Sequence, residues 1–111
     1  MEISTRTVKN WSILDISGNI RRQTAPLFKS YCQDLIKKSK LRIIANFELV
    51  DTIDSVGLGI LISVSKELTA VNGKFVLMAL NENIHELLEM TSVDKMFPVL
   101  KSEEDLATFV C

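Results

Sequence analysis

The chain has 111 residues, of which 47% are apolar, and this size and composition fit one domain with a single well-filled core. Its 13 basic and 14 acidic residues nearly balance, so there is no broad basic field for DNA or RNA, and we expect no nucleic-acid partner. No apolar run approaches the roughly 18 to 20 residues that cross a bilayer, and the first residues do not read as a signal peptide. We therefore expect a cytoplasmic protein with no membrane insertion.

Two strands and a helix are predicted in the first part of the chain. β-Branched segments over 2–8 and 11–17 are separated by Lys9-Asn10, which is typical of a hairpin turn. Thr24 then fits the N-cap of a helix with Pro26 in its first turn, and apolar residues recur at helical spacing until near Lys38. The mostly apolar run 41–47 follows, and it suits a strand that is buried on both faces.

Helices and strands alternate in the rest of the chain. A helix is predicted from Ser55 to Ala70, a strand over 74–80, a helix over 82–90 and a strand near 96–100. Ser102 and the acidic residues after it begin a last helix that ends near Val110. This order predicts an α/β fold with one mixed sheet of about five strands, the first two paired and the later ones parallel, and about four helices. We expect a single domain over 1–111.

The segment 51–59 is a candidate functional site, because functional residues of open α/β sheets lie where a strand ends and a helix begins. Ser55 has two interpretations there. It is placed to cap the helix by accepting a hydrogen bond from an unpaired backbone N–H. Alternatively it is phosphorylated, because a phosphate is stabilised at a helix N-terminus yet repels an acidic or apolar partner.

The helix after Ser55 is predicted to have two faces. Spacing of 100° per residue turns one set toward the sheet, namely Leu58, Leu61, Ile62, Ser65 and Leu68. The opposite set is Val56, Ile60, Ser63 and Glu67. Gly57 and Gly59 each cost a helix about 1 kcal/mol relative to alanine, a cost that close approach of another backbone would explain. That backbone belongs either to this protein or to a partner, and next to a phosphorylation site the outward face suggests a docking patch.

The sequence predicts no enzyme. His85 is its only histidine and falls on a predicted surface helix, and no Cys-x-x-Cys pair or His/Cys cluster has the spacing of a zinc site. Gly57-Leu58-Gly59 lacks the other glycine and the lysine of a phosphate-binding loop. Asp51 and Asp54 are explained by capping and by hydrogen bonds to the loop. We therefore expect no catalytic residue, no cofactor and no metal ion.

Four features are distributed over nearly the whole chain: Gly18, Asn46, the run Asp54-Ser55-Val56-Gly57-Leu58-Gly59, and Asn72-Gly73-Lys74. Together they resemble the bacterial anti-sigma factor antagonists, small proteins with the STAS fold. The resemblance implies docking on a serine-protein kinase that is also an anti-sigma factor. It further implies that phosphorylation of this loop releases the antagonist and that a serine phosphatase restores binding.

The chain departs from the family pattern in two places. Most such antagonists read Asp-Ser-Ser-Gly and accept phosphate on the second serine, where this chain has Val56. Phosphorylation would then fall on Ser55, which resembles the acceptor of stressosome STAS proteins, and Thr52 is a weaker candidate because it precedes the helix. After Gly18, where the family often carries an acidic residue, the chain reads Asn19-Ile20-Arg21-Arg22. Arg21 and Arg22 are a solvated turn, or they favour an acidic partner or hold a phosphate on Ser55.

The predicted partner-binding set contains the run from Asp54 to Ile60 together with Ser63, Arg21 and Arg22. The first functional hypothesis is a partner switch controlled by phosphorylation. The second is a constitutively bound accessory or scaffold subunit, stressosome-like or transporter-associated, which Val56 keeps open. A third is a sensor of a small ligand or nucleotide, for which the sequence shows no pocket.

Overall fold

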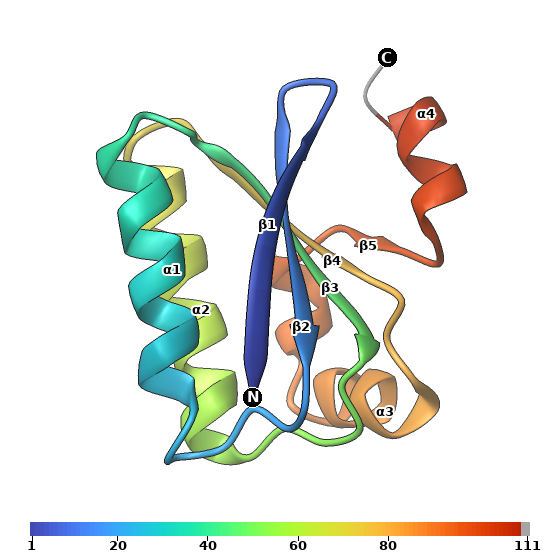
Figure 1. Cartoon of the computed structure of the whole chain (residues 1–111). Coiled ribbons are helices and arrows are strands. Elements are labelled where there is room, and N and C mark those ends of the chain that lie inside the picture. The colour runs from blue at the N-terminus through green and yellow to red at the C-terminus, as the bar shows by residue number, and fades with distance from the viewer. Residues whose placement is uncertain (110–111) are drawn as a thin grey trace.

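The computed structural model describes residues 1–109, and a five-stranded sheet forms its centre (Figure 1). The strands lie in the order β1-β2-β3-β4-β5. They are β1 (Glu2–Val8), β2 (Trp11–Ser17), β3 (Arg42–Leu49), β4 (Lys74–Met78) and β5 (Val99–Leu100). The helices are α1 (Ala25–Lys37), α2 (Ser55–Ala70), α3 (Glu82–Met90) and α4 (Leu106–Phe109), with 3₁₀ helices η1 (Val93–Met96) and η2 (Glu103–Asp105).

Strand pairing agrees with the order predicted from the sequence. β1 and β2 are antiparallel and joined by a hairpin whose Lys9 and Asn10 both have positive φ, 48° and 72°, as a two-residue turn requires. β2, β3, β4 and β5 are mutually parallel. The prediction of an α/β fold with a mixed sheet of five strands is therefore confirmed.

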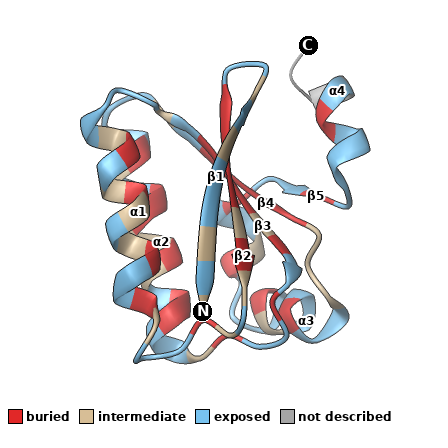
Figure 2. Ribbon diagram, viewed as in Figure 1, coloured by how far each residue is buried: buried red, intermediate tan, exposed pale blue. Residues whose placement is uncertain are grey.

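The two faces of the sheet are covered differently (Figures 1 and 2). All three long helices lie on one face, where residues such as Phe28, Leu61 and Ile84 pack on Leu14, Ile43 and Phe75 in the main core. The alternate residues of the strands point to the other face and form a smaller cluster with Leu106 of α4. Its members are Trp11, Ile13, Ile44, Val76, Met78, Leu100 and Leu106.

Several boundaries differ from those predicted. β4 ends at Met78 rather than at Leu80 because Ala79 takes a left-handed conformation with φ of 59°. β5 is only two residues long because residues 93–96 form η1. The predicted last helix is reduced to η2 and the four residues of α4, so the described chain has three long helices, and the predicted end at Val110 lies outside the described residues.

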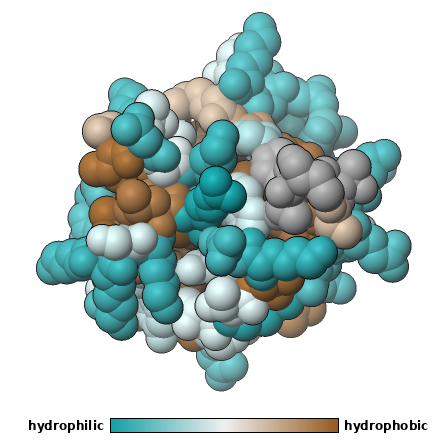
Figure 3. All heavy atoms as spheres, turned by 90° about the horizontal axis from the view of Figure 1, so that it is seen from above, coloured by the Kyte–Doolittle hydropathy of each residue, from teal (hydrophilic) through white to brown (hydrophobic). Residues whose placement is uncertain are grey.

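The surface at the hairpin end of the sheet is mostly hydrophilic, with a hydrophobic patch on the side where α1 and α2 lie (Figure 3). The opposite end of α1 and α2 carries the loops that lead into both helices (Figure 1). None of the helices formed by residues 1–109 is long and apolar enough to cross a membrane.

Candidate functional site at the start of α2

The N-cap of α2 is Asp54. Its backbone is extended, and its carboxylate oxygen Oδ1 accepts a hydrogen bond from the backbone N–H of Gly57 at 2.8 Å. Of the two interpretations of Ser55, the capping one is therefore wrong by one position, and the capping role expected of Asp54 is confirmed. Ser55 is the first residue of α2 and is exposed, and its hydroxyl has no hydrogen-bond partner among the residues that the structure describes.

Asp54 also joins α2 to the loop before α1. Its second carboxylate oxygen accepts from the backbone N–H of Arg22 at 2.8 Å, and its own N–H donates to the carbonyl of Ile20 at 3.1 Å. Ile20 in turn donates to the carbonyl of Thr52 at 3.2 Å and forms an isolated parallel bridge with Ile53. These bonds hold the two loops side by side, so the backbone around the start of α2 is well constrained.

Asn19 completes this connection, and the sequence reasoning assigned it no role. Its side-chain oxygen accepts a hydrogen bond from the backbone N–H of Thr52 at 3.1 Å, and its carbonyl accepts from the Thr24 hydroxyl at 2.8 Å. An asparagine directly after Gly18 was the available signal, since short amide side chains often bond to nearby loop backbone. Thr24 thus bonds within its own loop and makes no side-chain cap on α1.

Hydrogen bonds lower the pKa of Asp54. The backbone N–H of Gly57 is the largest cause, and the N–H groups of Arg22 and Val56 and the charge of Arg21 add to it. The carboxylate therefore remains ionised at neutral pH and fixes the start of α2 in its present place.

The two glycines of α2 have different surroundings. A Cβ added to the buried Gly57 would lie 2.7 Å from the Ile53 side chain and 2.8 Å from the carbonyl oxygen of Ile20. The predicted close approach of another backbone thus occurs within the protein at Gly57. A Cβ added to Gly59 would meet nothing within 4 Å, and this residue is exposed. The fold itself gives no reason for glycine at position 59.

The predicted partner-binding residues and outward face of α2 are only partly exposed. Ser55, Val56 and Gly59 are exposed, with 40% of Val56 accessible, whereas Gly57 and Leu58 are buried. Ile60 and Ser63 were predicted to face outward but are half-buried, as is Glu67. The reason is that α2 packs against α1 as well as against the sheet. Helical periodicity identifies only the side that faces the sheet, so it predicts exposure for a side that α1 partly covers.

Three further predicted residues lie around this start of α2. Arg21 and Arg22 are both exposed in the loop tied to Asp54, and neither forms an ion pair within the described part of the chain. Thr52 is exposed in the other loop, before the helix, as its sequence position predicted. Ser55 therefore lies between Asp54, to which the loop of Arg22 is bonded, and the exposed apolar residue Val56.

Leu27 in the first turn of α1 was not predicted to belong to this region. It is 44% exposed, and α1 and α2 lie side by side with their N-termini at the same end of the molecule (Figure 1). We call six of the exposed residues at this end the α2 N-terminal surface. They are Arg21, Arg22, Leu27, Ser55, Val56 and Gly59.

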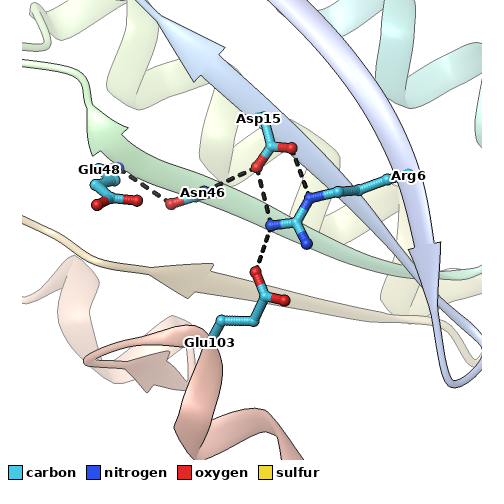
Figure 4. A network of polar contacts seen from close by, with 5 residues as sticks. All are labelled: Arg6, Asp15, Asn46, Glu48 and Glu103. Carbon is cyan, nitrogen blue, oxygen red and sulfur yellow. Dashed lines mark hydrogen bonds and ion pairs between the residues drawn. The ribbon is translucent and has the colours of Figure 1, made fainter.

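A second group of polar residues lies on the sheet face that α1, α2 and α3 leave open (Figure 4). Arg6 of β1 forms a two-bond ion pair with Asp15 of β2, at 2.6 and 3.2 Å, and also bonds to Glu103 of η2. Asn46 of β3 donates to Asp15 at 2.8 Å. We call these four residues the Arg6 network.

The Arg6 network shifts the pKa values of its members. Hydrogen bonding to Arg6 is the largest cause that lowers the pKa of Asp15 and of Glu103, and the bonds to Glu103 and Asp15 raise the pKa of Arg6. All three groups are therefore ionised over a wide pH range. Arg6 is paired with both carboxylates, so its charge is neutralised within the protein.

The described residues do not assemble a metal site. No group of three or more histidine, cysteine, aspartate or glutamate side chains within them could hold a metal ion. His85 lies on the exposed side of α3, where its Nδ1 is 2.8 Å from a carboxylate oxygen of Glu89. The start of α2 offers an exposed hydroxyl, a fixed backbone and two arginines without an ion pair in the described chain.

Comparison with known proteins agrees with this topology. The model of the STAS domain family matches residues 2–106. The chain therefore belongs to the STAS domain family. Since the match leaves out residue 1 and the last five residues, the extent of the single domain over 1–111 stays a prediction.

Individual relatives are distant in sequence and close in structure. The chain is 27% identical over 95 residues to the TM1081 homolog of Thermotoga neapolitana, a candidate anti-sigma factor antagonist, with 85% of this chain and 84% of that protein covered. The crystal structure of TM1081 from Thermotoga maritima has a TM-score of 0.91 at 24% identity, covering 97% and 93% of the two chains. The Bacillus protein SpoIIAA in its phosphorylated form has a TM-score of 0.76 at 18% identity, covering 99% and 100%.

Proposed function

We propose that this chain is an anti-sigma factor antagonist that works as a partner switch and has no catalytic activity of its own. Unmodified, it binds a serine-protein kinase that is also an anti-sigma factor through the α2 N-terminal surface. Phosphorylation of Ser55 breaks that contact, and a serine phosphatase restores it. The observation that carries the proposal is that Asp54 caps α2, which leaves the Ser55 hydroxyl exposed and without a partner in the described chain.

The position of Ser55 suits a switch that changes the surface and keeps the fold. A phosphate of charge about −1.5 to −2 at the first residue of a helix is stabilised by the helix dipole and by unpaired backbone N–H groups. The same charge next to the exposed Val56 would oppose an apolar partner contact. The constrained backbone supports a local effect, because Asp54, Arg22 and Ile20 would keep their hydrogen bonds.

The relatives lend support of two kinds. The Thermotoga proteins are described as candidate antagonists of anti-sigma factors, and they cover most of this chain. SpoIIAA has been described in a phosphorylated form. We extend both properties, antagonist action and phosphorylation, to this chain.

The acceptor is tested by incubating the protein with ATP and the serine-protein kinase encoded nearest to it, followed by intact-mass measurement and peptide mapping. We expect one phosphate on the wild type, one on Thr52→Ala and none on Ser55→Ala. Thr52→Ala is the matched control, and Ser55→Ala should keep the fold because the serine makes no hydrogen bond within the described chain that the variant would lose. Phosphate on Ser55→Ala, with the fold intact, would reject Ser55 as the acceptor.

The switch itself is tested with Ser55→Asp, which adds charge at the same position. We expect this variant to fold normally, because an acidic first-turn residue complements the helix dipole, and to lose the kinase in a binding assay. Ser55→Asn is the matched control, since it has similar size and no charge. Equal binding by Ser55→Asp and the wild type would contradict the proposed switch.

One observation favours the constitutive accessory or scaffold alternative. Val56 is exposed at the position where most antagonists carry the phosphorylated serine, and an apolar side chain there provides a contact that phosphorylation of its own position cannot interrupt. Under this alternative Val56→Asp abolishes partner binding while Ser55→Asp does not. A partner that is a transport protein rather than a kinase would support the same conclusion.

A further inference from the structure

The α2 N-terminal surface has a charge pattern that specifies the chemistry of what binds it. We infer that the partner is a protein segment that places an acidic side chain against Arg21 and Arg22, next to an apolar contact with Leu27 and Val56. This inference rests on the proposed function in one respect, namely that a protein docks at this surface. It adds the chemical nature of the partner segment and the residues that select it.

The backbone of both arginines is fixed. The N–H of Arg22 bonds to Asp54 at 2.8 Å, and the N–H of Arg21 bonds to the Thr24 hydroxyl at 2.9 Å. The carbonyl of Arg21 accepts from the N–H groups of Thr24 and Ala25 at the start of α1. The two cations are therefore attached to the start of both helices, and little backbone order remains to be gained when a partner binds.

Their charges are not neutralised within the described chain. Asp54 is bonded to the backbone of Arg22, but its two carboxylate oxygens accept from the backbone N–H groups of Gly57 and Arg22. The charge of Arg21 reaches Asp54 through space without an ion pair. Arg6 is the useful contrast, because its guanidinium is shared by the carboxylates of Asp15 and Glu103.

The apolar neighbours determine the class of partner. Leu27 and Val56 are 44% and 40% exposed in the first turns of the two helices, and Gly59 leaves open space beside Val56. A phosphate backbone would need a wider basic surface, whereas this one offers two cations next to apolar side chains in a chain of net charge −1. Such a combination fits a protein surface with an apolar centre and an acidic rim.

The test is photo-crosslinking with the full chain in a lysate of its own cells, with a photoreactive side chain at the exposed Gln23, between the arginines and Thr24. The crosslinked partner segment is sequenced, and its yield is compared among three proteins. They are the wild type, the double variant Arg21→Glu/Arg22→Glu, and the control Lys66→Glu/Lys74→Glu. The control makes the same charge change at exposed lysines toward the other end of α2.

We expect the arginine reversal to lower the crosslinking yield about tenfold and the lysine reversal to leave it nearly unchanged, because a charge outside the interface acts weakly. The yield of the wild type should fall when salt is raised from about 0.05 M to about 0.5 M. The crosslinked segment should contain an aspartate or glutamate, and replacing that residue by arginine should restore binding to the arginine reversal. Circular dichroism should show that both double variants fold.

Several outcomes would overturn the inference: no crosslinked protein, a partner segment without an acidic residue, a crosslink to nucleic acid, or equal yields from all three proteins. The identity of the captured partner tests the proposed function, and the charge of the crosslinked segment tests the inference, so the two can fail separately. An acidic segment in a protein that is neither a kinase nor an anti-sigma factor would support the inference and reject the proposed function. A kinase captured through a neutral segment would support the proposed function and reject the inference.

Discussion

The α2 N-terminal surface and the Arg6 network both contain arginine and aspartate, but their hydrogen bonds are arranged in opposite ways. In the Arg6 network the charged side chains bond to one another, across β1, β2 and η2. At the start of α2 the Asp54 carboxylate bonds to backbone N–H groups, and the arginines are held by their backbone. The first arrangement satisfies the charges inside the protein, and the second leaves two cations and a serine hydroxyl accessible.

This difference separates a structural role from a binding role without reference to residue type. Charges that neutralise one another contribute modestly to stability and offer little to a partner. Charges on a fixed backbone with no internal counter-ion contribute little to stability and are available for binding. Substitutions in the two regions should therefore move different measurements, stability in one and partner affinity in the other, with the residues that shape the backbone of α2 affecting both.

The largest effect is expected at Gly57. Gly57→Ala places a Cβ 2.8 Å from the fixed carbonyl oxygen of Ile20, and it should lower the free energy of unfolding by about 2 kcal/mol despite alanine's higher helix propensity. Gly59→Ala is the matched control, since its Cβ meets nothing within 4 Å, and it should stabilise the protein by about 1 kcal/mol. Urea denaturation measures both. A destabilised Gly59→Ala would show that position 59 is constrained by the fold.

Capping is expected to have the next largest effect. Asp54→Ala removes the acceptor of the Gly57 and Arg22 N–H groups and should lower the thermal midpoint clearly, because a lost cap leaves backbone donors unpaired. Ser55→Ala should leave the midpoint nearly unchanged, since its hydroxyl has no partner in the described chain. The measurement is thermal unfolding by circular dichroism. The reverse order of the two midpoints would return the capping role to Ser55.

The sequence was sufficient for most of the fold, and the physical reasons are local. Alternating β-branched residues and Lys9-Asn10 specify the hairpin, and helical spacing specifies α1, α2 and α3. The left-handed conformation of Ala79 was not predictable, because nothing in its residue type favours positive φ.

The candidate site was located by sequence but not resolved in detail. Asp54 and Ser55 are both good N-cap residues, so composition could not decide between adjacent positions. The packing of α2 against α1, which half-buries Ile60 and Ser63, depends on a second helix that periodicity in one segment does not reveal. Arg6 and Glu103 are 97 residues apart in the chain, and no local pattern joins them.

The Arg6 network should give a smaller effect than the cap. Arg6→Gln removes the ion pair with Asp15 and the bond to Glu103. It should lower the free energy of unfolding by about 1 kcal/mol, a modest value because the Arg6 and Asp15 side chains are 37% and 33% exposed and solvent weakens their attraction. Glu103→Gln, at a more exposed carboxylate, should cost less than about 0.5 kcal/mol. Neither should change partner affinity. A loss of partner binding by Arg6→Gln, with the fold intact, would break the distinction between the two regions.

The smallest expected effect is the loss of stability at acid pH, which tests both regions at once. The pKa values of Asp54, Asp15 and Glu103 are all lowered in the folded protein, so the unfolded chain binds protons more readily at these groups. Their contribution is complete above the ordinary carboxyl pKa of about 4 and is lost as pH falls through the lower folded values.

Urea denaturation between about pH 5 and pH 2 should therefore show stability falling with pH, and Asp54→Asn should flatten part of that fall. Salt should reduce the contribution of the Arg6 network, which depends on attraction between partly exposed charges, more than that of Asp54, which depends mainly on backbone hydrogen bonds. If Asp54→Asn left the slope unchanged, the hydrogen bonds at the start of α2 would not favour the ionised carboxylate. The contrast between a backbone-bonded and a side-chain-bonded aspartate would then fail at its simplest point.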